Sequence, residues 1–179
     1  MGYREPAKEI VDGKIDLSPW GSLRLEARDR LVLQKAGYSA AEVDPGPLFS
    51  KSTWLLCFPN LEEGFALLGE YMGPVVSRVD LTAQSLEPKA ELKRHRDSGL
   101  RYLTFRAAGA RALAVYENGL VCFDSQGEKL WQLEHMYLST RLASIDRDVV
   151  WLQDETIGRA WGYDLDSGRP IAERGLLRY

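Results

Sequence analysis

The sequence has few of the residues from which catalytic and metal sites are usually built. It contains 2 histidines and 2 cysteines, so Ser-His-Asp, Cys-His and imidazole-rich metal arrangements have few possible members. His95 lies between two arginines and His135 lies near Tyr137, which indicates a solvated loop residue and a packing residue. Cys57 and Cys122 lie in apolar runs typical of buried thiols, with no second Cys or His at metal-ligand spacing. We therefore predict no catalytic residue and no metal.

The chain also lacks a strong charge of one sign and a long hydrophobic run. It has 23 basic and 26 acidic residues and a formal net charge of -3. Nucleic-acid binding needs clustered, uncompensated cations, so we expect no nucleic-acid partner. No apolar stretch approaches the roughly 18 residues of a membrane-spanning helix. The segment 1–6 carries charges and a proline where a secretory signal has an apolar run. We therefore expect a cytoplasmic protein that does not bind membranes.

The composition is that of a folded globular protein, since 45% of the residues are hydrophobic and 27% are charged. The length of 179 residues suits one compact domain. We predict a single domain over residues 1–179. Its predicted parts are an N-terminal hairpin and loop (1–52), a degenerate sheet unit (53–98) and two regular four-strand units (99–135 and 140–174).

A repeat of about forty residues is the most informative pattern in the chain. The segment from Val121 to Trp131 reads VCFDSQGEKLW, and it is echoed from Gly162 to Ile171 by GYDLDSGRPI. Each copy has an apolar strand end, an aspartate, a short polar turn with a glycine, and a second strand. Antiparallel strands are joined in this way at minimal length. The repeat therefore predicts successive antiparallel hairpins.

Alternation of polar and apolar residues predicts strands along most of the chain. The predicted strands are 22–26, 30–35, 53–58, 65–71, 75–81, 101–106, 111–117, 120–124, 128–134, 141–145, 149–153, 159–164 and 169–174. Residues 39–43 have room for one helical turn, and the charged segment 87–97 is expected to be a solvated connection or a short helix. The expected fold class is all-β, made of antiparallel meander sheets with little helix.

The dipeptide Asn118-Gly119 is a strong hairpin signal, because its two-residue turn needs positive φ at both positions. This turn predicts a register with Tyr116 opposite Val121. In that register both faces of the strand pair are apolar. A sheet that is apolar on both faces must be covered on both sides, so we predict that small sheets stack face to face.

The two copies resemble the repeats of quinoprotein-type and WD-like β-propellers, in which an aromatic residue often follows the turn glycine by four positions. The matching residues are Asp124, Gly127 and Trp131 in one copy and Asp164 and Gly168 in the next. Ala172 stands at the aromatic position of the second copy, and a third copy begins at Asp80 without the glycine. The resemblance implies a partial β-propeller or a propeller-derived β-sandwich of about three and a half blades, and it implies no cofactor.

Acidic pairs at predicted turns are candidate partner-binding residues: Glu62 with Glu63, and Asp154 with Glu155. Trp20, between a proline and a glycine, is the tryptophan expected to be partly exposed, and aromatic side chains often anchor interfaces. These features favour a non-catalytic intracellular protein-binding domain, with a basic protein as one candidate partner. In size and acidity the chain resembles bacterial immunity proteins, which neutralise a toxin by covering its active site.

Two other functions stay open from the sequence. A cleft between sheets could bind a small molecule or support hydrolysis, with Asp164 or Glu155 as the acid/base group. Alternatively, an incomplete arc of sheets could close by forming a homodimer in a self-associating structural protein.

Overall fold

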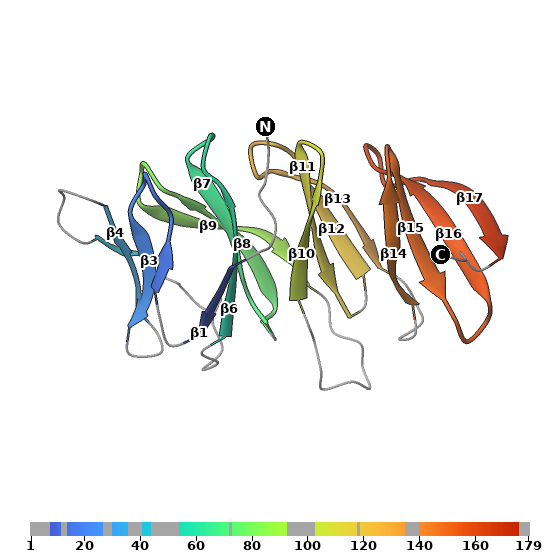
Figure 1. Ribbon diagram of the computed structural model, residues 1–179, viewed down its shortest axis with the longest axis horizontal. Coiled ribbons are helices and arrows are strands. Elements are labelled where there is room, and N and C mark those ends of the chain that lie inside the picture. The colour runs from blue at the N-terminus through green and yellow to red at the C-terminus, as the bar shows by residue number, and fades with distance from the viewer. Residues whose placement is uncertain are drawn as a thin grey trace.

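The computed structural model describes nine segments: 8–11, 14–26, 30–35, 41–43, 54–71, 73–92, 103–117, 119–134 and 140–175. These segments contain seventeen β-strands and no helix (Figure 1). The strands form four sheets, and all pairings between them are antiparallel. The predicted all-β fold of antiparallel meanders is confirmed.

Each sheet is a meander, and we number the sheets along the chain. The first contains β2 (Lys14–Asp16), β3 (Ser22–Glu26), β4 (Arg30–Gln34) and β5 (Ala41–Val43). The second contains β6 (Trp54–Asn60), β7 (Phe65–Glu70), β8 (Val75–Asp80) and β9 (Ser85–Glu91), with β1 (Lys8–Val11) added beside β6. The third contains β10 (Leu103–Ala108), β11 (Arg111–Tyr116), β12 (Gly119–Phe123) and β13 (Lys129–Glu134). The fourth contains β14 (Thr140–Asp146), β15 (Val149–Asp154), β16 (Arg159–Asp164) and β17 (Pro170–Gly175).

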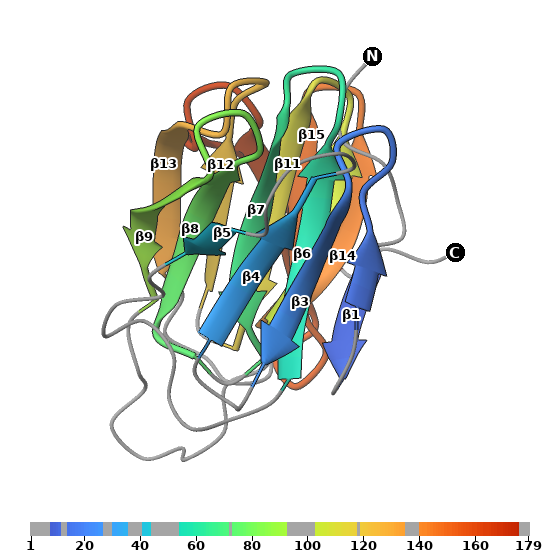
Figure 2. The same ribbon diagram turned by 90° about the vertical axis from the view of Figure 1, so that its left-hand side faces the viewer.

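The four sheets stand side by side in chain order along the longest dimension of the protein (Figure 1). The first and fourth sheets lie at opposite ends and do not meet. Seen along the row, the sheets lie one behind another with their faces toward each other (Figure 2). The arrangement is an open row of four blade-like sheets, which gives four units where the sequence predicts about three and a half.

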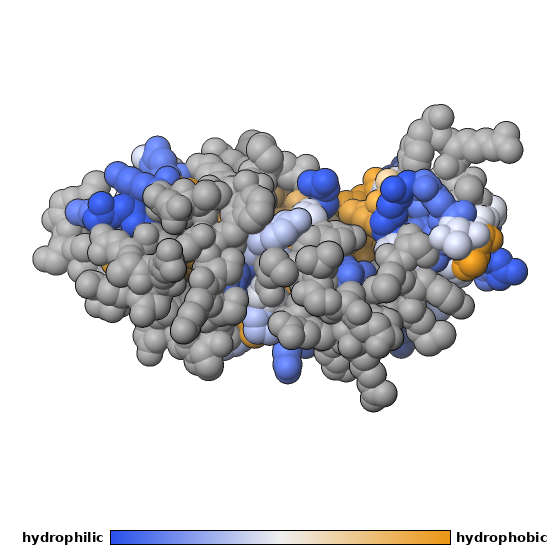
Figure 3. All heavy atoms as spheres, turned by 90° about the horizontal axis from the view of Figure 1, so that it is seen from below, coloured by the Kyte–Doolittle hydropathy of each residue, from blue (hydrophilic) through white to orange (hydrophobic). Residues whose placement is uncertain are grey.

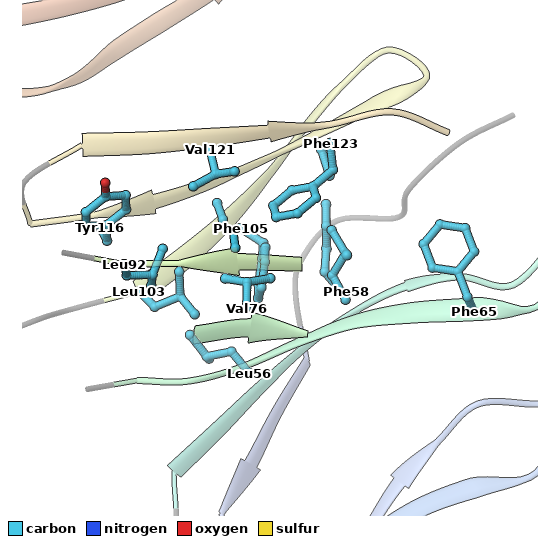
Figure 4. Packing of buried hydrophobic residues seen from close by; sticks show 14 residues of the cluster. Leu56, Phe58, Phe65, Val76, Leu92, Leu103, Phe105, Tyr116, Val121 and Phe123 are labelled. Carbon is cyan, nitrogen blue, oxygen red and sulfur yellow. The ribbon is translucent and has the colours of Figure 1, made fainter. Parts of the chain in front are cut away.

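Three apolar clusters fill the spaces between neighbouring sheets. The first joins the first and second sheets through residues such as Leu23, Leu33 and Leu55. The second joins the second and third sheets and is shown in Figure 4. In it the rings of Phe58 and Phe105 stack with centroids 5.5 Å apart and planes inclined by 10°. Each inner sheet is thus covered on both faces, as the apolar pattern predicts.

The third cluster shows how one strand serves two interfaces. Leu113 and Val115 of β11 pack toward the fourth sheet, while Ala114 and Tyr116, which alternate with them, pack toward the second. Successive residues of a strand point to opposite faces, so an uninterrupted apolar run supplies both clusters. An uninterrupted apolar run in a strand therefore indicates a sheet that is covered on both faces.

The predicted register of the β11–β12 hairpin is wrong by two residues. Tyr116 lies opposite Gly119, and Val121 lies opposite Ala114. Gly119 is a strand residue, and a Cβ there would lie within 3.1 Å of the Leu133 backbone. Because side chains alternate with a period of two, the error changes the partners and leaves every side chain on its predicted face.

Two further local predictions are wrong. The sequence leaves room for one helical turn at residues 39–43, but Ala41–Val43 forms strand β5 and pairs with β4. The charged segment 87–97 begins within β9, an edge strand whose register shifts once, opposite Val76 and Ser77. An edge strand tolerates Pro88 and charged side chains because one of its sides has no ladder partner. Pairing with the neighbouring strand decides the conformation in both places.

The strand β1 departs from a simple row of repeats. It precedes the first sheet in the sequence, yet it pairs with β6 of the second sheet, with Lys8 opposite Cys57 and Val11 opposite Trp54. The second sheet therefore has five strands. In chain order, β1 belongs to the second sheet, β2 to β5 form the first sheet, and β6 continues the second sheet.

Candidate functional site

The strand directions gather most hairpin turns on one edge of the protein, the upper edge in Figure 1. In a meander the strands alternate in direction, so every second turn lies at the same end. We call this the turn edge and define it by the turns 17–21, 61–64, 81–84, 109–110, 124–128, 147–148 and 165–169. Direct contacts between turns support the assignment, since the backbone N–H of Leu165 donates to the carbonyl of Asp148 at 2.7 Å.

The repeated aspartates shape three of these turns. Asp124 Oδ1 accepts bonds from the N–H groups of Gln126 and Glu128 at 2.8 and 2.9 Å. Asp164 accepts from the backbone and hydroxyl groups of Ser167 at 2.7 and 2.6 Å. These side-chain-to-backbone bonds replace the ladder where each turn begins. The aspartates in the motif are therefore turn-forming residues.

The third copy of the motif adopts the same geometry. Asp80 Oδ1 accepts bonds from the N–H groups of Thr82 and Ala83 at 2.9 and 2.8 Å. Gln84 has a φ of 53°, so a non-glycine residue occupies the left-handed region in this turn. Arg78 pairs with the Asp80 carboxylate at 3.1 Å. The aspartate is thus the feature common to all three copies.

Replacing Asp80 with alanine should destabilise the protein by about 1–2 kcal/mol at pH 7, as the loss of a similar capping side chain does. Burial raises the pKa of Asp80, but hydrogen bonds from Ala83, Thr82 and Arg78 outweigh it and leave the pKa lowered. The carboxylate therefore stabilises the fold above its ordinary pKa of 3.8, and this contribution is lost as the pH falls through the lowered value. Urea unfolding of both proteins between pH 7 and pH 2 should show the difference shrinking at the acid end.

The matched control is Asp148→Ala, because Asp148 is an exposed acid on the same edge. Its effect on stability should stay small at every pH. A D80A difference that persists unchanged at the lowest pH would contradict a role for the ionised carboxylate.

A second regular feature of the turn edge is a hydrogen bond from each sheet to the next. Trp20 Nε1 donates to the Leu61 carbonyl of the second sheet at 2.8 Å. Asn60 Nδ2 of the second sheet donates to a carbonyl of the third, that of Ser125, at 3.0 Å. Trp131 Nε1 of the third donates to the Leu165 carbonyl of the fourth at 2.8 Å. At every junction at least one side chain therefore ties successive sheets together.

An aromatic ring lies over a turn glycine of the following sheet at each junction. The rings and glycines are Trp20 with Gly64, Phe65 with Gly127, and Trp131 with Gly168. A Cβ added at these glycines would lie 3.1, 2.7 and 2.7 Å from the respective ring. The glycine and the tryptophan of the sequence motif therefore belong to successive interfaces. The sequence alone does not show this pairing, because the two partners lie one repeat apart.

Trp20 is partly exposed, as expected from its neighbours, and Lys35 Nζ lies 5.4 Å from the centre of its ring. Its hydrogen bond to Leu61 places it beside the predicted acidic pair Glu62 and Glu63. Both glutamates are exposed on the turn edge. Glu63 accepts a hydrogen bond from Gln126 Nε2 of the third sheet at 3.0 Å. Three of the five candidate residues are thus brought together.

The other predicted pair lies on the opposite edge, because the turn 155–158 is at the far end of β15 from the turn 147–148. Asp154 is 0% exposed and accepts bonds from Thr156 N and Ile157 N at 2.8 and 3.3 Å, so its carboxylate is not presented on the surface. Glu155 is exposed and forms an ion pair with Arg141. Of this candidate pair, Glu155 is thus presented on the surface and Asp154 is not, and a role of the pair in partner binding stays a prediction.

The residues considered for catalysis have structural contacts. The hydrogen bonds from Ser167 lower the pKa of Asp164, so this carboxyl group is ionised at neutral pH. Both cysteines are buried, and burial raises the pKa of Cys122 to about 12. His95 and His135 lie outside the described residues. Within the described segments, no three His, Cys, Asp or Glu residues are placed to hold a metal ion, and no helix is long and apolar enough to span a membrane.

Comparison with known proteins finds no matching family model and no matching curated protein. Solved structures that are similar to this chain include BamB from Moraxella catarrhalis, with 13% identity and a TM-score of 0.41 over 94% of this chain and 52% of that one. They also include a europium-containing methanol dehydrogenase (11% identity, TM-score 0.36, 93% of this chain and 27% of that one). The WD40 β-propeller domain of Doa1 is a third (12% identity, TM-score 0.32, 96% and 71%).

The row of four antiparallel meander sheets, packed face to face, is a degenerate propeller-like arrangement. Its sheets have the blade order and the face-to-face packing of that architecture, so the resemblance read from the repeat is confirmed. The chain spans about half of the BamB structure, 52% of its length. The row of sheets determines where the candidate residues lie, and the contacts of each residue determine its chemistry.

Proposed function

We propose that this chain is a non-catalytic protein-binding domain that contacts its partner through the turn edge. The supporting observation is the charge exposed there. The exposed acidic residues of these turns and their flanks are Asp16, Glu62, Glu63, Glu128, Asp146, Asp148 and Asp166, against the exposed basic residues Lys129, Arg147 and Arg169. Of these carboxylates, Glu128 pairs with Lys89 and Asp166 pairs with Arg111. The excess of carboxylates favours a basic partner, which such a surface would attract over long distances at low salt.

The hairpin turns suit binding because their conformation does not depend on the exposed side chains. Buried or turn-forming groups such as Asp80, Asp124 and Asn60 hold the backbone. Exposed residues between them can therefore be exchanged without loss of the fold, and a rigid surface loses less conformational entropy on binding. A rigid edge built on a stack of sheets supports recognition of a folded partner.

In its more specific form, the proposal is that the chain acts inside a bacterial cell as an immunity protein. Its acidic edge would then cover the basic active-site surface of a toxin. Size, mild acidity and the charge of the turn edge support this form. Homodimerisation is the competing use of an exposed surface, and light scattering at high protein concentration separates the two, because the proposal expects a monomer.

The direct test is capture of the tagged protein from its native lysate at two salt concentrations, followed by kinetics with the captured partner. The variant E62K/E63K should lower the association rate constant about tenfold or more at low salt, with a smaller effect at high salt. E155K is the matched control, since Glu155 is an exposed glutamate on the opposite edge. Equal association rates for wild type and E62K/E63K would refute binding through the turn edge.

A further inference from the structure

The outer face of the fourth sheet has no neighbouring sheet among the described residues, because this sheet ends the row (Figure 1). The strand registers place its side chains in two cross-strand rows. One row consists of Ser144, Trp151, Gly162 and Ala172, and the next of Arg141, Gln153, Ala160 and Arg174. Seen from below, apolar surface appears in the half of the protein that holds the third and fourth sheets (Figure 3). Among the described residues at this end, Ile171 of β17 is 54% exposed, so the end is not uniformly polar.

The centre of the face is an indole covered by a guanidinium group. Trp151 lies against Gly162, where an added Cβ would be 3.0 Å from the ring. Arg174 Cζ lies 3.6 Å from the centre of the same ring. A guanidinium group stacked on an indole keeps its N–H groups at its edge, where they can bind a carboxylate with two parallel hydrogen bonds. Within the described segments, no carboxylate forms an ion pair with Arg174.

A buried acceptor lies in the row beside this stack. Gln153 is 7% exposed, and its Oε1 atom has no hydrogen-bond partner. By strand alternation Gln153 is on the same face as Trp151, two residues away. A buried acceptor is normally paired with a donor, so the face has one hydrogen-bonding position to fill. A ligand for this face would carry both a donor and a negative charge.

The small residues on the face argue against another sheet as the ligand. The third sheet meets its neighbour with Trp131 paired to Cys122, whereas the fourth has Ala172 paired to Gly162 at the matching position. Alanine and glycine leave too little side chain to interdigitate with a second sheet. The opposite end of the row exposes Lys14, Asp16 and Gln34 on the outer face of the first sheet, beside the buried Val32. A shallow face with one arginine that is unpaired within the described segments fits a thinner ligand, a single extended chain.

We propose that the outer face of the fourth sheet binds an extended, acidic segment of a partner polypeptide. A glutamate or aspartate of the segment pairs with Arg174. A small apolar side chain of the segment packs on Ala172 beside the Trp151 ring, and a backbone N–H donates to Gln153 Oε1. This surface is separate from the turn edge and takes a ligand of the opposite charge.

The test is a titration of the ¹⁵N-labelled protein with a capped synthetic peptide of alternating glutamate and valine, followed by amide chemical shifts. The amides of Gly162 and Ala172 should shift in a saturable way. A peptide with glutamine in place of glutamate should bind at least tenfold more weakly. Arg174→Gln should cause the same loss, while Arg169→Gln, an exposed arginine in the β16–β17 turn, should not.

Absence of shifts at Gly162 and Ala172, or equal binding of the two peptides, would overturn the proposal. The peptide pair tests the contact on the unaltered protein, so the answer does not depend on the stability of R174Q. The variant E62K/E63K should bind the acidic peptide as the wild type does. Failure of the turn-edge proposal and failure of this one are therefore distinguishable.

Discussion

Replacing Phe105 with alanine should lower the free energy of unfolding by about 3–5 kcal/mol, the cost typical of removing a buried aromatic ring. Phe105 is 1% exposed and stacks on Phe58, which is 0% exposed, across the junction of the second and third sheets. The ring has no access to water, so its removal loses packing on both sheets and leaves a cavity. Urea denaturation monitored by circular dichroism measures the loss.

A double-mutant cycle with Phe58→Ala separates the ring pair from general burial. The stacked pair should contribute a coupling of about 0.5–1.5 kcal/mol beyond the two single losses. The exposed Leu130→Ala serves as a surface control and should change stability by less than about 0.5 kcal/mol. A loss for F105A as small as that of L130A would mean that this junction does not form in solution.

The second large effect is expected for Gly168→Ala. Gly168 has a φ of 68°, and a Cβ there would lie 2.7 Å from the ring of Trp131. The left-handed backbone costs an alanine about 1–2 kcal/mol, and displacing the packed ring adds about 1–3 kcal/mol. The total loss of unfolding free energy should therefore be about 2–5 kcal/mol in the same urea experiment.

Gly158→Ala is the matched control for the cost of the left-handed backbone conformation alone. Gly158 has nearly the same φ, 69°, but an added Cβ would meet nothing within 4 Å. The difference between G168A and G158A therefore measures the contact between the third and fourth sheets. Combining G168A with Trp131→Ala should remove most of that difference, because the small side chain leaves room for the new methyl group. Equal losses in G168A and G158A would contradict the ring-on-glycine contact.

Local structure can be predicted from the sequence where the residues that contact each other are also neighbours in the chain. Asp124 and Gly127 belong to one hairpin, so their spacing alone predicts the turn that they form. The apolar run of β11 indicates covering on both faces because successive side chains of one strand point to opposite faces. In contrast, β5 is a strand only because β4 lies beside it, and the local sequence of residues 39–43 cannot reveal that partner.

The candidate site was harder to predict than the fold because its geometry depends on strand direction. Glu62 and Asp154 look alike in the sequence, since each lies in a short acidic turn. They lie on opposite edges because β6 and β15 run in opposite directions between those edges. Counting strands within each meander separates them, but the count needs every strand, including the charged edge strand β9. The burial of Asp154 has no local signal at all.

The pairing of β1 with β6 has a consequence for how the protein unfolds. In a linear array each repeat contacts only its neighbours, so terminal repeats can fray while the rest stays folded. Here the whole first sheet is inserted in the sequence between two paired strands of the second sheet, with β1 before it and β6 after it. Complete loss of the second sheet would also release the closed loop of chain that contains the first. The two sheets are therefore expected to form one cooperative unit in hydrogen exchange, and the fourth sheet, attached at one junction, is free to open separately.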